Sequence, residues 1–138
     1  MADRVRKISY CYINVPNRAG QGDQVLGVLR NAGVNLLAHS GFPIGRGKTQ
    51  LDFVPEDMPA FHRVARTNGW RVSKVKKAFL ITGNDRVGAA HRHFQKLAEA
   101  KINITAADAM VAGKGRFGMI LWVKPKSYVH AARVLRAR

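Results

Sequence analysis

The chain has 138 residues and carries 24 lysines and arginines against 8 aspartates and glutamates, a formal net charge of +16. Hydrophobic residues make up 46%, yet no apolar run approaches the roughly 18 residues of a membrane-spanning helix, so we expect a globular protein rather than a membrane protein. The single cysteine, Cys11, excludes an internal disulfide, and residues 1–7 are too polar for a signal peptide. We therefore expect a cytoplasmic protein.

The positive charge is spread along the whole chain. Residues 1–75 hold 11 basic and 5 acidic side chains, and residues 76–138 hold 13 and 3. A field of this sign attracts polyanions whatever the fold. The charge alone leaves nucleic acid, an anionic metabolite and an acidic protein open as partners.

Residues 15–35 have a similar counterpart at residues 83–103. Sliding the sequence against itself by 68 residues, without a gap, aligns turn glycines, apolar helix positions and strand starts. The identical pairs include Ile13 and Ile81, Arg18 and Arg86, Gly20 and Gly88, Leu29 and Leu97, Ala32 and Ala100, and Asn35 and Asn103. The pattern predicts a duplicated small domain, with one copy in residues 1–75 and the other in residues 76–138.

The first copy has the element order β-α-β-β-α-β. Runs of β-branched and aromatic residues alternate with loops rich in glycine and proline, and apolar residues recur at helical spacing between them. Asp23 is expected to cap the first helix, and acidic residues open the second. The expected strands are 8–15, 34–41, 49–54 and 70–75, and the expected helices begin near residues 23 and 55.

The second copy repeats the order but lacks a fourth strand. Its expected strands are 78–82, 102–112 and 117–123, and its expected helices are 89–100 and 125 onward. Three explanations stay open: a truncated chain, an N-terminal segment that fills the gap, or an open edge that pairs with a second chain.

These residues resemble a known family. Each copy has an N-R-x-G or D-R-x-G loop after its first strand, and an apolar-Asn-apolar triplet opens its second strand, at residues 34–36 and 102–104. Over nearly the whole chain this resembles the small stand-alone tandem ACT domain proteins. The resemblance implies an α+β fold of two ferredoxin-like βαββαβ units side by side, in which eight antiparallel strands carry four helices on one face.

The resemblance also implies a regulatory function. Members of this family bind small effectors, commonly amino acids, near the loops after strand one, so we expect a small-molecule effector, a homodimer and a partner enzyme, with no cofactor. The ligand-binding residues that the resemblance implies are Asn17, Arg18, Ala19, Gly20, Asn35, Asp85, Arg86, Val87, Gly88 and Asn103. In this interpretation Asn35 reaches the ligand from a neighbouring unit.

The same residues have a structural interpretation that stays open. Gly20 and Gly88 are needed by a turn in any case, Asn35 and Asn103 can bond the backbone and fix the register of strand two, and exposed loop arginines are normally solvated. The chain also departs from the family pattern. Serine-binding members have a histidine on strand one where this chain has Val15 and Gly83, so the particular amino acid cannot be inherited.

Catalytic and metal sites are not expected. The five histidines have no spacing that suggests a third ligand, and His91 and His93 point to different faces of a helix. No acid and base pair or nucleophilic arrangement is suggested, so we expect no enzyme activity.

The alternative function is RNA binding, because an RNA recognition motif has the same element order and basic charge. The aromatic spacing of its strand-three signature is absent at residues 114–123, but Tyr10 and Tyr12 offer a stacking pair.

Overall fold

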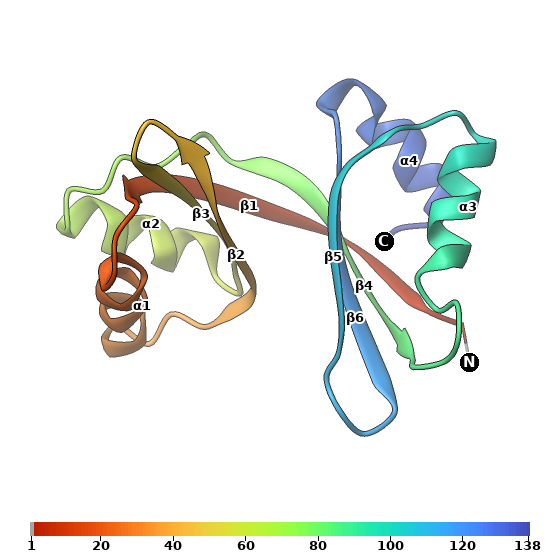
Figure 1. Cartoon of the computed structure of the whole chain (residues 1–138), viewed down its shortest axis with the longest axis horizontal. Helices are drawn as coiled ribbons and strands as arrows, with labels where there is room; N and C mark the ends of the chain where they lie inside the picture. Colours follow the sequence, from red (N-terminus) through yellow and green to blue (C-terminus); the bar gives the residue numbers. More distant parts are fainter. Residues whose placement is uncertain (1) are drawn as a thin grey trace. The chain divides into compact units, whose positions relative to one another are not determined.

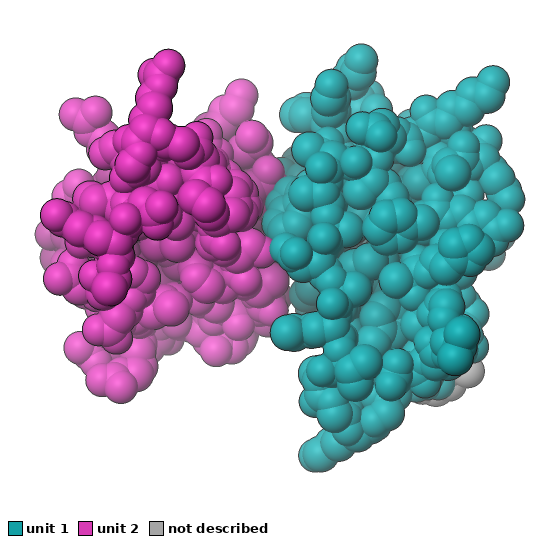
Figure 2. Space-filling model, in the orientation of Figure 1, with its two compact units in different colours: residues 1–8, 77–138 teal, residues 9–76 magenta. Residues whose placement is uncertain are grey.

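The computed structural model describes residues 2–138, which form two compact units (Figures 1 and 2). Of the described residues, unit 1 contains 2–8 and 77–138, and unit 2 contains 9–76. Unit 2 thus holds most of the first sequence copy and unit 1 most of the second. No helix within the described residues is long and apolar enough to cross a membrane.

Unit 2 is a three-stranded antiparallel sheet with two helices. Its elements are the second part of β1 (Arg4–Pro16), α1 (Gln21–Asn31), β2 (Leu36–Gly45), β3 (Lys48–Pro55) and α2 (Met58–Thr67). The strands lie in the order β2-β3-β1. Both helices cover one face of the sheet, because the alternate residues Cys11 and Ile13 of β1 and Phe53 of β3 form one core with Leu29 of α1 and Phe61 of α2.

Unit 1 repeats this architecture. Its elements are β4 (Lys76–Asn84), α3 (His91–Glu99), β5 (Ile104–Val111), β6 (Arg116–Val123), a 3₁₀ turn at Pro125–Ser127 and α4 (Tyr128–Leu135). The hydrogen-bonded order is β1-β4-β6-β5, in which β1 contributes residues 4–8. Phe79, Ile81, Leu97, Met119 and Leu121 are among the buried residues of its core.

The duplication predicted from the sequence extends to the backbone geometry. Ile13 pairs with Leu51 in unit 2 and Ile81 pairs with Met119 in unit 1, the same register moved by 68 residues. The irregularity between Leu36 and Ala38 recurs between Ile104 and Ala106. The predicted α+β class and ferredoxin-like units are confirmed.

Three expectations were wrong in detail. Residues 70–75 do not form a strand, although the Ser73 N–H donates to the Tyr12 carbonyl of β1 at 2.9 Å. The described residues therefore contain six strands, one fewer than the seven expected from the two copies. Helix α1 begins at Gln21 with Gly20 as its cap, because Gly20 takes a left-handed conformation (φ 91°) there, and Asp23 lies in the first turn. Strand β1 begins at Arg4, four residues before the predicted start at residue 8.

The first part of β1 is held at the end of unit 1. The Lys7 N–H donates to the Arg138 carbonyl at 2.9 Å, and the Arg138 N–H donates to the Val5 carbonyl at 3.1 Å. Residues 5–7 therefore lie beside the segment after α4.

Candidate ligand site

The loop between β1 and α1 in unit 2 is built in the same way as the loop between β4 and α3 in unit 1. In unit 2 the Asn17 N–H donates to the Gly47 carbonyl at 2.8 Å, and in unit 1 the Asp85 N–H donates to the Gly115 carbonyl at 2.8 Å. Gly20 has a φ of 91° and Gly88 a φ of 77°, a region that other residues rarely adopt. These bonds tie each loop to the tip of its β2-β3 or β5-β6 hairpin.

All the predicted site residues in these two loops are solvent-exposed. Residues 17–20 and residues 85–88 are exposed along their whole length, and Val87 is fully exposed. The loops therefore present backbone and side chains on the surface, and neither buries its arginine.

Asn35 lies at the other end of the hairpin from Asn17. Its Nδ2 donates to Glu56 Oε2 at 2.7 Å, and its carbonyl accepts from the Glu56 N–H at 2.9 Å. Since Leu36 pairs with Pro55 whereas Pro16 pairs with Lys48, the whole length of β3 separates the two asparagines within unit 2. Asn103 has the same position in unit 1 and is exposed.

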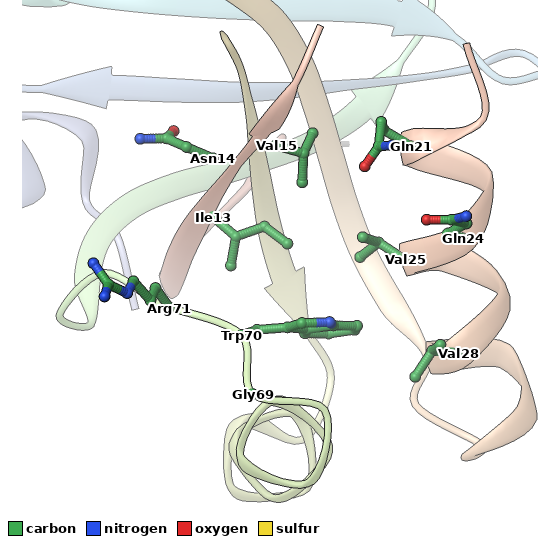
Figure 3. Close-up of a pocket in the computed structure, with 10 residues that line it drawn as sticks. All are labelled: Ile13, Asn14, Val15, Gln21, Gln24, Val25, Val28, Gly69, Trp70 and Arg71. Carbon is green, nitrogen blue, oxygen red and sulfur yellow. The ribbon is translucent and has the colours of Figure 1, made fainter. Parts of the chain in front are cut away.

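A cavity of about 700 Å³ lies between β1 and α1 of unit 2 (Figure 3). Its lining residues are Ile13, Asn14, Val15, Gln21, Gln24, Val25, Val28, Gly69, Trp70 and Arg71. Figure 3 shows Ile13 and Val15 directed from β1 toward α1, with the Trp70 ring across the end of the gap. The ten residues predicted for the site are not among the lining residues.

The cavity has apolar walls and a polar edge on α1. Gln21 and Gln24 lie one helical turn apart in the first part of α1, and each amide offers a donor and an acceptor. No side chain caps the helix, because its cap residue is Gly20. The N–H groups of the first turn of a helix have no partner within the helix, and they carry partial positive charge.

Trp70 could not be assigned to this site from the sequence, because residues 70–75 were expected to form a strand. The chain turns after α2 at Gly69 (φ 67°), and the Trp70 N–H donates to the Ala65 carbonyl at 2.9 Å. The Trp70 ring packs near Phe61, with 6.2 Å between ring centroids. Gln24 lies next to Val25 on the predicted helix, but Gln21 falls in the loop that was expected before it, so the sequence did not bring the two glutamines together.

The one cysteine is not suited to nucleophilic chemistry. Cys11 is fully buried, and its thiol is 3.9 Å from the Met58 sulfur. Burial, with a smaller contribution from the negative charge of Asp52, raises the pKa of Cys11 to about 11. The thiol therefore stays protonated at neutral pH, and the thiolate is the reactive form.

Unit 1 also has a cavity, with a different character. It measures about 280 Å³ and is lined by Lys7, Lys77, Tyr128, Val129, Ala132, Arg133, Arg136 and Ala137. Four of these residues are cationic and none is acidic. This surface contributes to the positive charge of unit 1.

Comparison with known proteins supports the fold. No protein-family model and no curated protein matches the chain. Among solved structures, protein BT0572 from Bacteroides thetaiotaomicron has 17% identity and a TM-score of 0.81, over 96% of this chain and 88% of that chain. The regulatory subunit of aspartate kinase from Thermus thermophilus has 17% identity and a TM-score of 0.60, over 98% and 93%.

A third structure is described as a putative C-terminal regulatory domain of aspartate kinase from Porphyromonas gingivalis. It has 11% identity and a TM-score of 0.58, over 97% of this chain and 93% of that chain. The chain has a tandem ACT fold. At these identities the likeness establishes the fold of the two ACT units and not a ligand.

Proposed function

We propose that the chain is a regulatory, ligand-sensing module that binds an amino acid in the cavity of unit 2. The cavity is the single observation that carries this proposal, because it combines an apolar interior with the start of a helix. Its volume of about 700 Å³ falls within the range of about 300–1,000 Å³ that is usual for small-molecule sites.

The chemistry of the walls suits an amino acid with an apolar side chain. The positive end of the α1 dipole, which reaches the cavity at Gln21 and Gln24, would favour the α-carboxylate, although the N–H groups of these two residues already donate to the Arg18 and Gly20 carbonyls. The Gln21 and Gln24 amide oxygens would accept from the α-ammonium group, and Val15, Val25 and Trp70 would surround the side chain. The loop of residues 17–20 joins the two elements that line the cavity, which gives the predicted loop a supporting part in this site.

A ligand in this position would regulate by joining separate segments. It would contact β1, α1 and the segment after α2 at once, and so stabilise their packing by its binding free energy. We propose that a partner enzyme or a second copy of the chain responds to this change, and that the module itself catalyses no reaction. The aspartate kinase regulatory domains of the same fold support such a role.

A thermal-shift screen with the twenty amino acids tests this proposal. We expect one or a few apolar amino acids to raise the melting temperature, with a shift that saturates with concentration. Val25→Phe, which fills the cavity, should abolish the shift, whereas the matched control Leu26→Phe on the exposed side of α1 should keep it. A flat screen, or the same response in both variants, would contradict the proposed site.

Nucleic acid binding is the second candidate function. Both hairpin tips carry a basic residue in the left-handed region between two glycines, Arg46 (φ 55°) in unit 2 and Lys114 (φ 53°) in unit 1. Basic residues at two equivalent exposed tips suit phosphate contacts. This function requires retention on single-stranded RNA that weakens steeply with salt, and unchanged retention between about 50 and 200 mM salt would exclude it.

A further inference from the structure

Unit 1 contains a buried carboxylate that is held by an imidazole. The Oδ2 atom of Asp3 lies 2.7 Å from His93 Nε2, and the two side chains are 6% and 3% exposed. Arg92 Nη1 lies 3.7 Å from the same oxygen. Asp3 precedes β1 and His93 lies on α3, so the contact joins residues 90 positions apart in the sequence.

The contact occupies the place that corresponds to the cavity of unit 2. Val15 pairs with Thr49 in unit 2, and Gly83 pairs with Phe117 in unit 1, so residues 15 and 83 are equivalent. Helices α1 and α3 end with equivalent hydrogen bonds. The Val34 N–H donates to the Leu29 carbonyl, and the Ile102 N–H, 68 residues further on, donates to the Leu97 carbonyl.

The same shift places His93 where unit 2 has Val25, and Arg92 where it has Gln24. Three residues that line the cavity of unit 2 are therefore represented in unit 1 by glycine, arginine and histidine. Two valines and a glutamine of unit 2 thus correspond in unit 1 to a glycine, which leaves space, and to an arginine and a histidine, which can contact an anion.

Gly83 provides the space for the carboxylate. A Cβ atom at this position would overlap Asp3 Oδ1 and would lie 2.8 Å from a ring carbon of Phe117. Gly83 is not among the residues with a positive φ, so its backbone conformation does not require glycine. The close approach of the Asp3 carboxylate is the reason that only glycine fits.

The imidazole acts as a hydrogen-bond donor in this contact. Burial lowers the pKa of His93, against the opposing effect of Asp3, so the ring is neutral at pH 7. A neutral ring bonded to a carboxylate carries its proton on Nε2 and donates it to Asp3 Oδ2. Within the described residues its Nδ1 atom has no hydrogen-bond partner.

We propose that Gly83, Arg92 and His93 form a carboxylate-binding site in unit 1, and that Asp3 occupies it as a tethered ligand which a free small carboxylate can replace. The site is the counterpart of the unit 2 cavity, but it stands on its own contacts and does not require a ligand in unit 2. Because a tethered group acts at an effective concentration in the millimolar range or above, a free carboxylate competes weakly while Asp3 is present. Removal of the Asp3 side chain opens the site.

The test is rescue of Asp3→Ala by acetate or formate. We expect this variant to melt at a lower temperature than the unchanged protein, and up to about 100 mM acetate to restore part of the loss, with saturation, relative to the same concentration of chloride. The unchanged protein and the control Asp85→Ala, which removes an exposed carboxylate of the same unit, should not respond. The His93 ring signals in the NMR spectrum of Asp3→Ala should move toward their original positions on addition of acetate.

Two results would overturn this site. One is that acetate changes neither the melting temperature nor the His93 signals of Asp3→Ala. The other is that acetate raises the melting temperature of the unchanged protein, Asp3→Ala and Asp85→Ala equally. If Asp3→Ala does not fold in chloride, refolding in acetate decides the matter, since recovery supports the site and no recovery contradicts it. The variant Val25→Phe should retain the acetate response of Asp3→Ala when the two are combined, which separates this site from the proposed function of unit 2.

Discussion

Replacing Gly83 by alanine should destabilise unit 1 far more than a glycine-to-alanine change normally does. The added Cβ would overlap the Asp3 carboxylate, so Asp3 must leave its place between Gly83 and His93. Loss of a hydrogen bond to a buried charged group costs about 1.5–3 kcal/mol, and overpacking against Phe117 adds about 1–3 kcal/mol. We therefore expect the free energy of unfolding to fall by about 2.5–6 kcal/mol.

Urea denaturation followed by circular dichroism measures this change, and Gly118→Ala is the matched control. Gly118 lies on the adjacent strand β6, where a Cβ atom would meet only the Ile81 carbonyl oxygen at 4.0 Å, an ordinary contact. The control should stay within about 1 kcal/mol of the unchanged protein. In the Gly83→Ala variant, adding Asp3→Ala should lower the free energy of unfolding much less than Asp3→Ala does in the unchanged protein, because the contact between Asp3 and His93 is already lost. A loss below about 1 kcal/mol for Gly83→Ala, or full additivity of the two changes, would refute this reasoning.

Three further predictions concern titration, reactivity and the cavity. Because the pKa of His93 is lowered from its ordinary value of 6.5 in the folded state, the unfolded chain takes up a proton first as the pH falls. The free energy of unfolding should therefore be constant above about pH 6.5 and decline below it. In melting curves recorded at several pH values, His93→Gln should reduce this decline, whereas the control His130→Gln, at an exposed position, should leave it unchanged. Cys11, with its pKa of about 11, should resist a thiol reagent at pH 8 in the folded protein and react fully in denaturant, and fast reaction without denaturant would contradict its burial. Phe61→Ala should lower the free energy of unfolding by about 3–5 kcal/mol, because Phe61 is fully buried and its ring packs near that of Trp70. A melting temperature equal to that of the unchanged protein would contradict the burial of Phe61 in the core of unit 2.

The parts of the fold that local sequence determines were predictable. Gly20 and Gly88 were assigned to turns, and both have a positive φ in equivalent loops. Leu29 and Leu97, which the comparison of the two copies aligned as apolar helix positions, are both buried. His91 and His93 were expected on different faces of one helix, and the first is exposed whereas the second is buried.

The sites depend on contacts that no local pattern encodes. Trp70 reaches the cavity because the chain turns at Gly69 and does not continue as a strand, although its aromatic and β-branched neighbours favour a strand. The bond between Asp3 and His93 joins residues 90 positions apart, and an isolated aspartate near the start of a sequence gives no sign of a buried partner. Gly83 was noted only as a departure from a family pattern, and the reason for it became visible in the space that it leaves for a carboxylate.

The cavity of unit 2 is tested most directly by the indole signals of the two tryptophans. Trp70 lines the cavity, and Trp122 belongs to unit 1, so one reports on the site and the other serves as an internal control. In a ¹⁵N-labelled sample titrated with each amino acid, we expect the Trp70 Nε1–H signal to shift and saturate for at least one apolar amino acid while that of Trp122 stays in place. A Trp70 signal that no amino acid moves would contradict the proposal that this module senses an amino acid in the cavity between β1 and α1.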